Sequence, residues 1–74
     1  MNHSKVNVQH RDGSKATSAR VVLSFGGCGV TKPVFTDRYG VAIVPHATTG
    51  RADVIVSGTT RGSFHAPGET VVFV

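Results

Sequence analysis

Cysteine is nearly absent from this sequence, because Cys28 is the only one among 74 residues. No intrachain disulfide can form, and no zinc site can be built from thiolates. The four histidines show neither His-x-His nor helical i, i+4 spacing, so we predict no metal site and no cofactor. A chain this short buries only about 60% of the surface that its unfolded form exposes. Self-association is the remaining way to support so small a core.

Long hydrophobic runs are also absent. None approaches the roughly 20 residues of a spanning helix, and the polar segment from Met1 to Arg11 lacks the apolar centre of a signal peptide. We therefore expect a cytoplasmic protein with no membrane partner. The length predicts a single domain over residues 1–74, with residues 1–4 disordered.

Acidic residues are few, four against eight lysines and arginines, which gives a net charge of +4. Proteins that bind nucleic acid gather basic residues on one face and often interleave stacking aromatics. Here the basic residues are spread almost evenly along the chain, and no aromatic pattern accompanies them. The charge is best interpreted as a solvated surface, and nucleic acid is not the predicted partner.

What the chain does contain is β-branched residues in alternating patterns. Ala19, Val21, Leu23 and Phe25 share one face of a strand, and no segment of about ten residues has apolar positions at helical spacing. The pattern predicts an all-β fold, a small antiparallel β-sandwich of about seven strands. We expect Val21, Leu23, Phe25, Ala42, Val44, Val54 and Val56 inside, and strands over 5–10, 19–25, 30–36, 41–45, 52–57, 59–62 and 70–74.

A turn signal stands in the middle of the chain, at Asp37-Arg38-Tyr39-Gly40. Gly40 can take a positive φ, and Asp37 can accept hydrogen bonds from the turn backbone. The pattern predicts a hairpin at this point, followed by a third strand after Gly50. Asp37 is therefore interpreted as a turn former and not as a catalytic acid.

This order of strands and turns resembles the carboxypeptidase regulatory-like domain, a small transthyretin-like β-sandwich. That resemblance implies a non-catalytic module that aids folding, interaction or attachment. Ala42 and Ala52 stand where members of that family usually place aromatics, so the core is leaner and a partner is expected. The matching residues are Val6, Val8, Asp12, Gly13, Ala19, Val21, Leu23, Thr36, Asp37, Gly40, Ala42, Val44, Gly50, Ala52, Val54, Val56 and Gly58.

Two alternative functions stay open. Thr60-Arg61-Gly62-Ser63 is similar to the Tyr-Arg-Gly-Ser ending of the transthyretin-like hydroxyisourate hydrolases, and His10 lies on the first predicted strand. Thr60 replaces the tyrosine, however, and the N-terminal signature of those enzymes is missing. The other alternative is a module that binds nucleic acid or carbohydrate.

One loop has the composition of a ligand site: Gly26, Gly27, Cys28 and Gly29. Glycines let a backbone approach a ligand and present amide N–H groups to an anion. A thiol there would act as a nucleophile only if a histidine activated it, and no sequence feature brings one near. We interpret the loop as a turn and predict no catalytic residue.

Both faces of the later strands are apolar, which predicts an interface. With Ala42, Val44, Val54 and Val56 inside, Val41, Ile43 and Ile55 are expected to face outward, because successive strand residues point to opposite sides. The last strand shows the same property, and Val72 and Val74 are added to this set. The sequence therefore predicts a protein partner, either a second copy in a homo-oligomer or a larger assembly.

Overall fold

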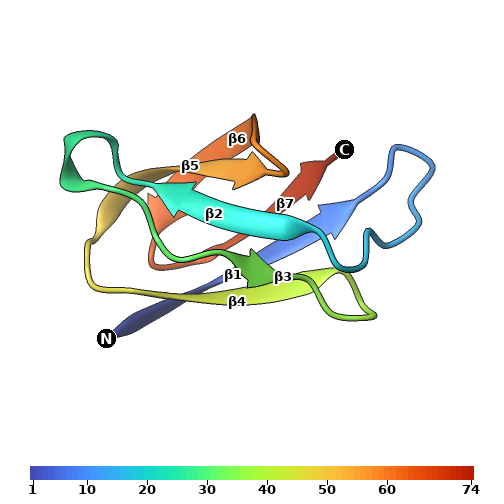
Figure 1. The fold of residues 1–74 in the computed structure, drawn as a ribbon, viewed down its shortest axis with the longest axis horizontal. Coiled ribbons are helices and arrows are strands. Elements are labelled where there is room, and N and C mark those ends of the chain that lie inside the picture. Colours follow the sequence, from blue (N-terminus) through green and yellow to red (C-terminus); the bar gives the residue numbers. More distant parts are fainter.

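The computed structural model describes residues 1–74 as seven strands and one short 3-10 turn (Figure 1). The elements are β1 (Asn2–Gln9), β2 (Arg20–Ser24), η1 (Gly26–Cys28), β3 (Val34–Phe35), β4 (Val41–His46), β5 (Gly50–Val56), β6 (Thr59–Ala66) and β7 (Glu69–Phe73). None of its helical segments has the length and apolar character needed to cross a membrane.

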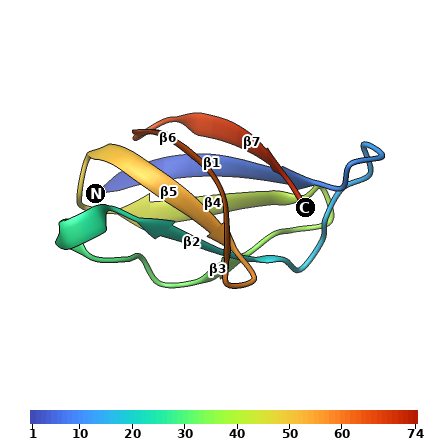
Figure 2. The same cartoon turned by 90° about the horizontal axis from the view of Figure 1, so that it is seen from above.

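The strands form two sheets, one with the order β4-β1-β7 and the other with the order β3-β2-β5-β6. Figure 2 shows the two layers stacked on each other, with β7 and β1 at the top and β2 and β3 at the bottom. β6 is an edge strand of the four-stranded sheet. The all-β class and the two-sheet architecture are confirmed. The expectation of purely antiparallel pairing is wrong, because β1 and β7 run parallel. The chain crosses from β6 into the other sheet before β7, and such a crossover permits parallel pairing.

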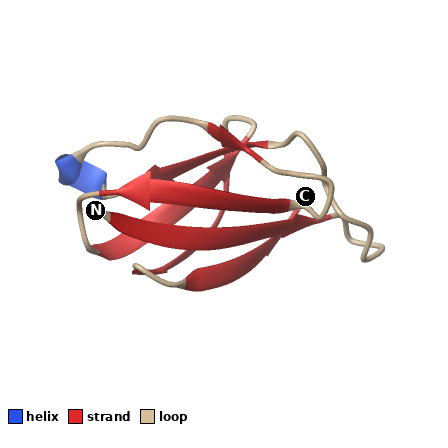
Figure 3. Ribbon diagram, turned by 90° about the horizontal axis from the view of Figure 1, so that it is seen from below, coloured by secondary structure: helices blue, strands red, loops and turns tan.

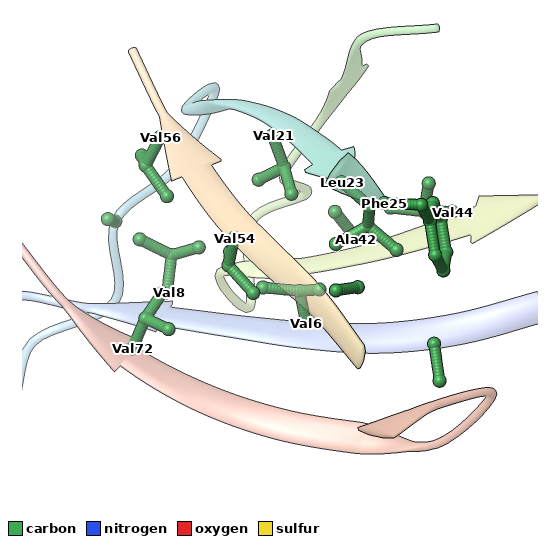
Figure 4. Packing of buried hydrophobic residues seen from close by; sticks show 13 residues of the cluster. Val6, Val8, Val21, Leu23, Phe25, Ala42, Val44, Val54, Val56 and Val72 are labelled. Carbon is green, nitrogen blue, oxygen red and sulfur yellow. The ribbon is translucent and has the colours of Figure 1, made fainter. Parts of the chain in front are cut away.

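The predicted core residues are all buried, which confirms the alternation predicted along β4 and β5 (Figure 4). On β2 the residue between Val21 and Leu23, Val22, is buried as well, so burial does not alternate there. Valine and alanine dominate this cluster, and Phe25 is its one aromatic member. β-branched side chains fit the pleated inner surface of a sheet. The 13 residues are Val6, Val8, Ala16, Val21, Leu23, Phe25, Ala42, Val44, Ala52, Val54, Val56, Ala66 and Val72.

The turn at Asp37 to Gly40 forms as predicted, but the hairpin does not. Asp37 Oδ1 accepts hydrogen bonds from the N–H groups of Tyr39 (2.8 Å) and Val41 (3.1 Å), and Gly40 has a φ of 73°. The strands on either side, β3 and β4, belong to different sheets. The prediction of a hairpin is wrong because β3 keeps only two residues after Pro33, and these pair with β2 instead.

The N-terminus also differs from expectation. β1 begins at Asn2 and Ser4 is buried, so residues 2–4 are part of a strand and not disordered. β6 extends to Ala66, beyond the predicted end at residue 62.

Thr36 holds the segment before β2 against the segment before β4. Its hydroxyl accepts a hydrogen bond from the Ala19 N–H (2.9 Å) and donates one to the Ala16 carbonyl (2.6 Å). Its backbone exchanges two more bonds with this segment, donating to the Ala19 carbonyl and accepting from the Ser18 N–H. Thr36 is buried, so no solvent replaces these partners.

We predict that Thr36→Val lowers the free energy of unfolding by about 1–3 kcal/mol, the cost of leaving buried polar groups unpaired. Thr36→Ser keeps the hydroxyl and is the matched control, with a smaller loss. Urea denaturation followed by circular dichroism measures both variants. Equal midpoints for the two variants would contradict this role of the hydroxyl.

The Asp12 turn supplies a prediction on pH. Hydrogen bonds from the Ser14 backbone N–H (2.9 Å) and hydroxyl (2.7 Å) lower the pKa of the exposed Asp12 carboxyl, the backbone bond having the larger effect. Because the folded pKa is the lower one, the stabilisation is present above the unfolded pKa and is lost as pH falls through the folded pKa. Ser14→Ala should raise the Asp12 pKa part of the way, as measured by NMR titration. An unchanged value would contradict the assignment.

Candidate functional site

A pocket of about 430 Å³ lies at one end of the sandwich. It is formed by η1, the loop after it, the end of β4 and Met1. Figure 3 shows the short helical turn η1 near the N-terminus of the chain. The predicted ligand loop contributes Cys28 and Gly29, and Lys32 is the only lysine or arginine side chain in the lining. The other residues are Met1, Phe25, Val30, Thr31, Pro45, His46, Ala47 and Thr48.

His46 is the buried polar residue of this pocket, with 4% of its surface exposed. Its Nδ1 lies 2.7 Å from the Thr48 carbonyl oxygen, and because a carbonyl only accepts, Nδ1 carries the proton. Nε2 then accepts a hydrogen bond from the Ser4 hydroxyl at 2.7 Å. Ser4 Oγ in turn accepts one from the Gly68 N–H at 3.2 Å. The His46 tautomer follows from this network.

The hydrogen bonds that link Gly68, Ser4, His46 and Thr48 support the fold and leave no polar group of this network free for catalysis. Ser4 is 1% exposed, so its hydroxyl does not reach a substrate. Both nitrogens of His46 are engaged, so neither has a free lone pair to take a proton from Cys28. The fold does bring a histidine into the pocket that Cys28 lines, which sequence spacing could not reveal because residues 28 and 46 belong to separate elements.

The residues that resemble the hydrolase signature lie elsewhere. His10 follows β1 and is exposed, and its N–H bonds the Ser14 carbonyl in the turn (2.8 Å). Arg61 and Ser63 are exposed on β6, in the other sheet. None of the three lines the pocket.

The predicted interface residues do not share one surface. Ile43 is 49% exposed on β4, and Val41 beside it is half-buried. Ile55 is half-buried on the other sheet, opposite Val22. Val74 packs against the core.

Val72 was expected to face outward, and this is wrong, because it is 3% exposed and belongs to the core. Its neighbours Val71 (48% exposed) and Phe73 (52%) face outward instead. All residues of this segment after Thr70 are apolar. Because polar and apolar residues do not alternate here, the sequence could not show which of them face the core. The pairing of β7 with β1 decides it, since Val72 lies level with the buried Val8.

The outer face of the β4-β1-β7 sheet therefore has a polar centre with apolar edges. The central strand β1 presents Lys5, Asn7 and Gln9. Across the sheet, the register places Val41, Asn7 and Val71 in one row, Ile43, Lys5 and Glu69 in the next, and Gln9 beside Phe73.

A comparison of the chain with protein-family models, with curated proteins and with solved structures finds no match. The resemblance to the carboxypeptidase regulatory-like domain stays a prediction from the residue pattern.

We predict that Ser4→Ala lowers the free energy of unfolding by about 1–3 kcal/mol, because the Gly68 N–H and His46 Nε2 both lose their partner. Ser63→Ala, at an exposed position, is the matched control and should stay within about 0.5 kcal/mol of the parent. Urea denaturation measures both. If the two substitutions have the same effect, the buried network does not stabilise this end of the fold.

Proposed function

We propose that this chain is a non-catalytic β-sandwich module that binds protein, either further copies of itself or a subunit of a larger assembly. One observation carries the proposal: Val71 and Phe73 of β7 are both about half exposed on the outer face of the β4-β1-β7 sheet. Covering one large apolar side chain contributes roughly 1.5–3 kcal/mol. Val71 and Phe73 are neighbours on one face of a strand, because residues two apart point to the same side, and together they favour association.

The composition of the core supports the same proposal. Its cluster holds one aromatic residue, one leucine and otherwise only valines and alanines, so it buries little apolar surface per residue. Small domains with lean cores commonly gain stability from a partner. The resemblance to a non-catalytic interaction module, carried by the residues from Val6 to Gly58, agrees with this role.

The pocket geometry also favours a structural role for its polar groups. His46 uses both nitrogens to join β1 to the loop after β4. A general base needs a free lone pair within hydrogen-bond reach of the proton that it takes. The Ser4 hydroxyl already occupies that lone pair.

We predict that sedimentation equilibrium in the micromolar range gives a mass above one chain, rising with concentration. Phe73→Lys should raise the dissociation constant about tenfold or more, because the loss of an apolar contact of this size exceeds 1.4 kcal/mol. Phe35→Lys is the matched control: Phe35 is 61% exposed on β3, in the opposite sheet. A chain that stays monomeric throughout, unaffected by Phe73→Lys, would contradict self-association.

A further inference from the structure

The outer edge of β7 carries backbone groups without a partner strand. Two hydrogen bonds show which residues of β7 direct their backbone groups toward β1. The Lys5 N–H donates to the Gly68 carbonyl (2.9 Å), and the Val74 N–H donates to the Gln9 carbonyl (2.8 Å). Backbone groups alternate in direction along a strand, and in a parallel ladder every second residue bonds the neighbour. Thr70, Val72 and Val74 therefore bond β1. The N–H and C=O groups of Glu69, Val71 and Phe73 point away from it.

The same alternate residues carry the exposed side chains. Val71 and Phe73 are 48% and 52% exposed, and the strand contains no proline and no register shift in its pairing with β1. An exposed apolar edge with free backbone groups is a template for pairing with another strand.

The β4 edge, at the other side of this sheet, is protected. Val8 bonds the Gly40 carbonyl, so Val41, Ile43 and Pro45 are the residues that direct their backbone to the free edge. Asp37 pairs with both backbone groups of Val41: its carboxylate accepts a hydrogen bond from the Val41 N–H, and its own N–H donates one to the Val41 carbonyl. Pro45 has no N–H to donate.

The edges of the other sheet are protected as well. β3 has only two residues and follows Pro33. β6 presents exposed polar side chains, Arg61 among them, and its pairing with β5 shifts register at Val54 and Ile55. Short edges, charges and bulges are the ways in which natural sheets prevent pairing. β7 differs from these edges because two successive edge-directed residues, Val71 and Phe73, have both free backbone groups and exposed apolar side chains, whereas on β4 only Ile43 has both.

We propose that β7 pairs with β7 of a second copy of this chain, antiparallel and about a two-fold axis, which joins the two β4-β1-β7 sheets into one. This inference rests on the proposed self-association and names its surface. In the pairing that we propose, Val71 of one copy lies opposite Phe73 of the other, and the two residues exchange both hydrogen bonds. Aromatic and β-branched residues are favourable cross-strand partners.

The neighbouring charges and the alternative register favour this arrangement. Glu69 is the only charged residue of β7 and lies level with Lys5 on β1, so their charges offset each other in a chain of net charge +4. Two copies therefore meet here without strong repulsion. The register that places Val71 opposite Val71 is less favourable, because it sets Phe73 against Glu69 of the other copy.

The direct test is a proline at the free edge. Val71→Pro removes an N–H that bonds nothing within the chain, so the fold is retained while the edge is blocked. We expect the dissociation constant to rise about tenfold or more, since two of the four bonds between the copies are lost. Ile43→Pro, at the equivalent position of the β4 edge, is the matched control and should leave the mass unchanged. Circular dichroism checks that both variants fold.

The outcomes separate this inference from the proposed function. If the parent chain associates and Ile43→Pro, but not Val71→Pro, lowers the mass, edge pairing through β7 is overturned while self-association stands. If both variants lower it equally, the contact is the outer face and edge pairing is again overturned. If the parent is a monomer across the micromolar range, both proposals of self-association fail.

Cross-linking tests the register in chains that also carry Cys28→Ser, which removes the native thiol. A mixture of Val71→Cys and Phe73→Cys chains should form a disulfide-linked dimer on oxidation, because residues directly opposite lie within disulfide reach. Each variant alone should form none, since its two cysteines are offset by two residues along the strands. A cross-link in Val71→Cys alone would overturn the proposed register.

Discussion

The structure depends on the hydrogen bonds that β1 makes along both of its edges. β1 pairs with β4 on one side and with β7 on the other, so the first strand of the sequence joins segments from its middle and its end. The even-numbered residues from Ser4 to Val8 face the core, and the odd-numbered ones stay outside. Because only one strand lies on each side of β1, both outer strands of this sheet have a free edge.

The two sheets pack through apolar side chains, and side-chain hydrogen bonds fix the segments that connect one sheet to the other. Thr36 binds the segment that leads into β2, and Asp37 binds the turn that leads into β4. At the opposite end, Ser4 and His46 connect β1 to two loops. No buried side-chain nitrogen or oxygen lacks a partner. Such fully paired networks specify the crossings, because breaking one bond leaves another buried group unpaired.

The pocket and the β7 edge differ in whether their polar groups have hydrogen-bond partners within the chain. In the pocket, the polar groups of His46 and Ser4 are already paired with each other and with the backbone. At the β7 edge, backbone groups and apolar side chains face outward together at Val71 and Phe73. Unpaired backbone groups next to apolar side chains favour a protein partner, since a strand added at this edge would bond the backbone and cover the side chains. The proposed role in assembly follows from this contrast.

Local pattern by itself determined the class of fold, the inward residues of β2, β4 and β5, and the turn at Asp37. These features depend on neighbours within a few residues, where alternation and turn chemistry act directly. Tertiary structure alone decided which strands pair. The Asp37 turn joins two sheets and forms no hairpin, because a turn signal sets the direction of the chain and not its neighbour. The outward face of β7 was decided in the same way. Its residues from Val71 to Val74 are all apolar, and only the register with β1 places Val72 in the core and leaves Val71 and Phe73 exposed.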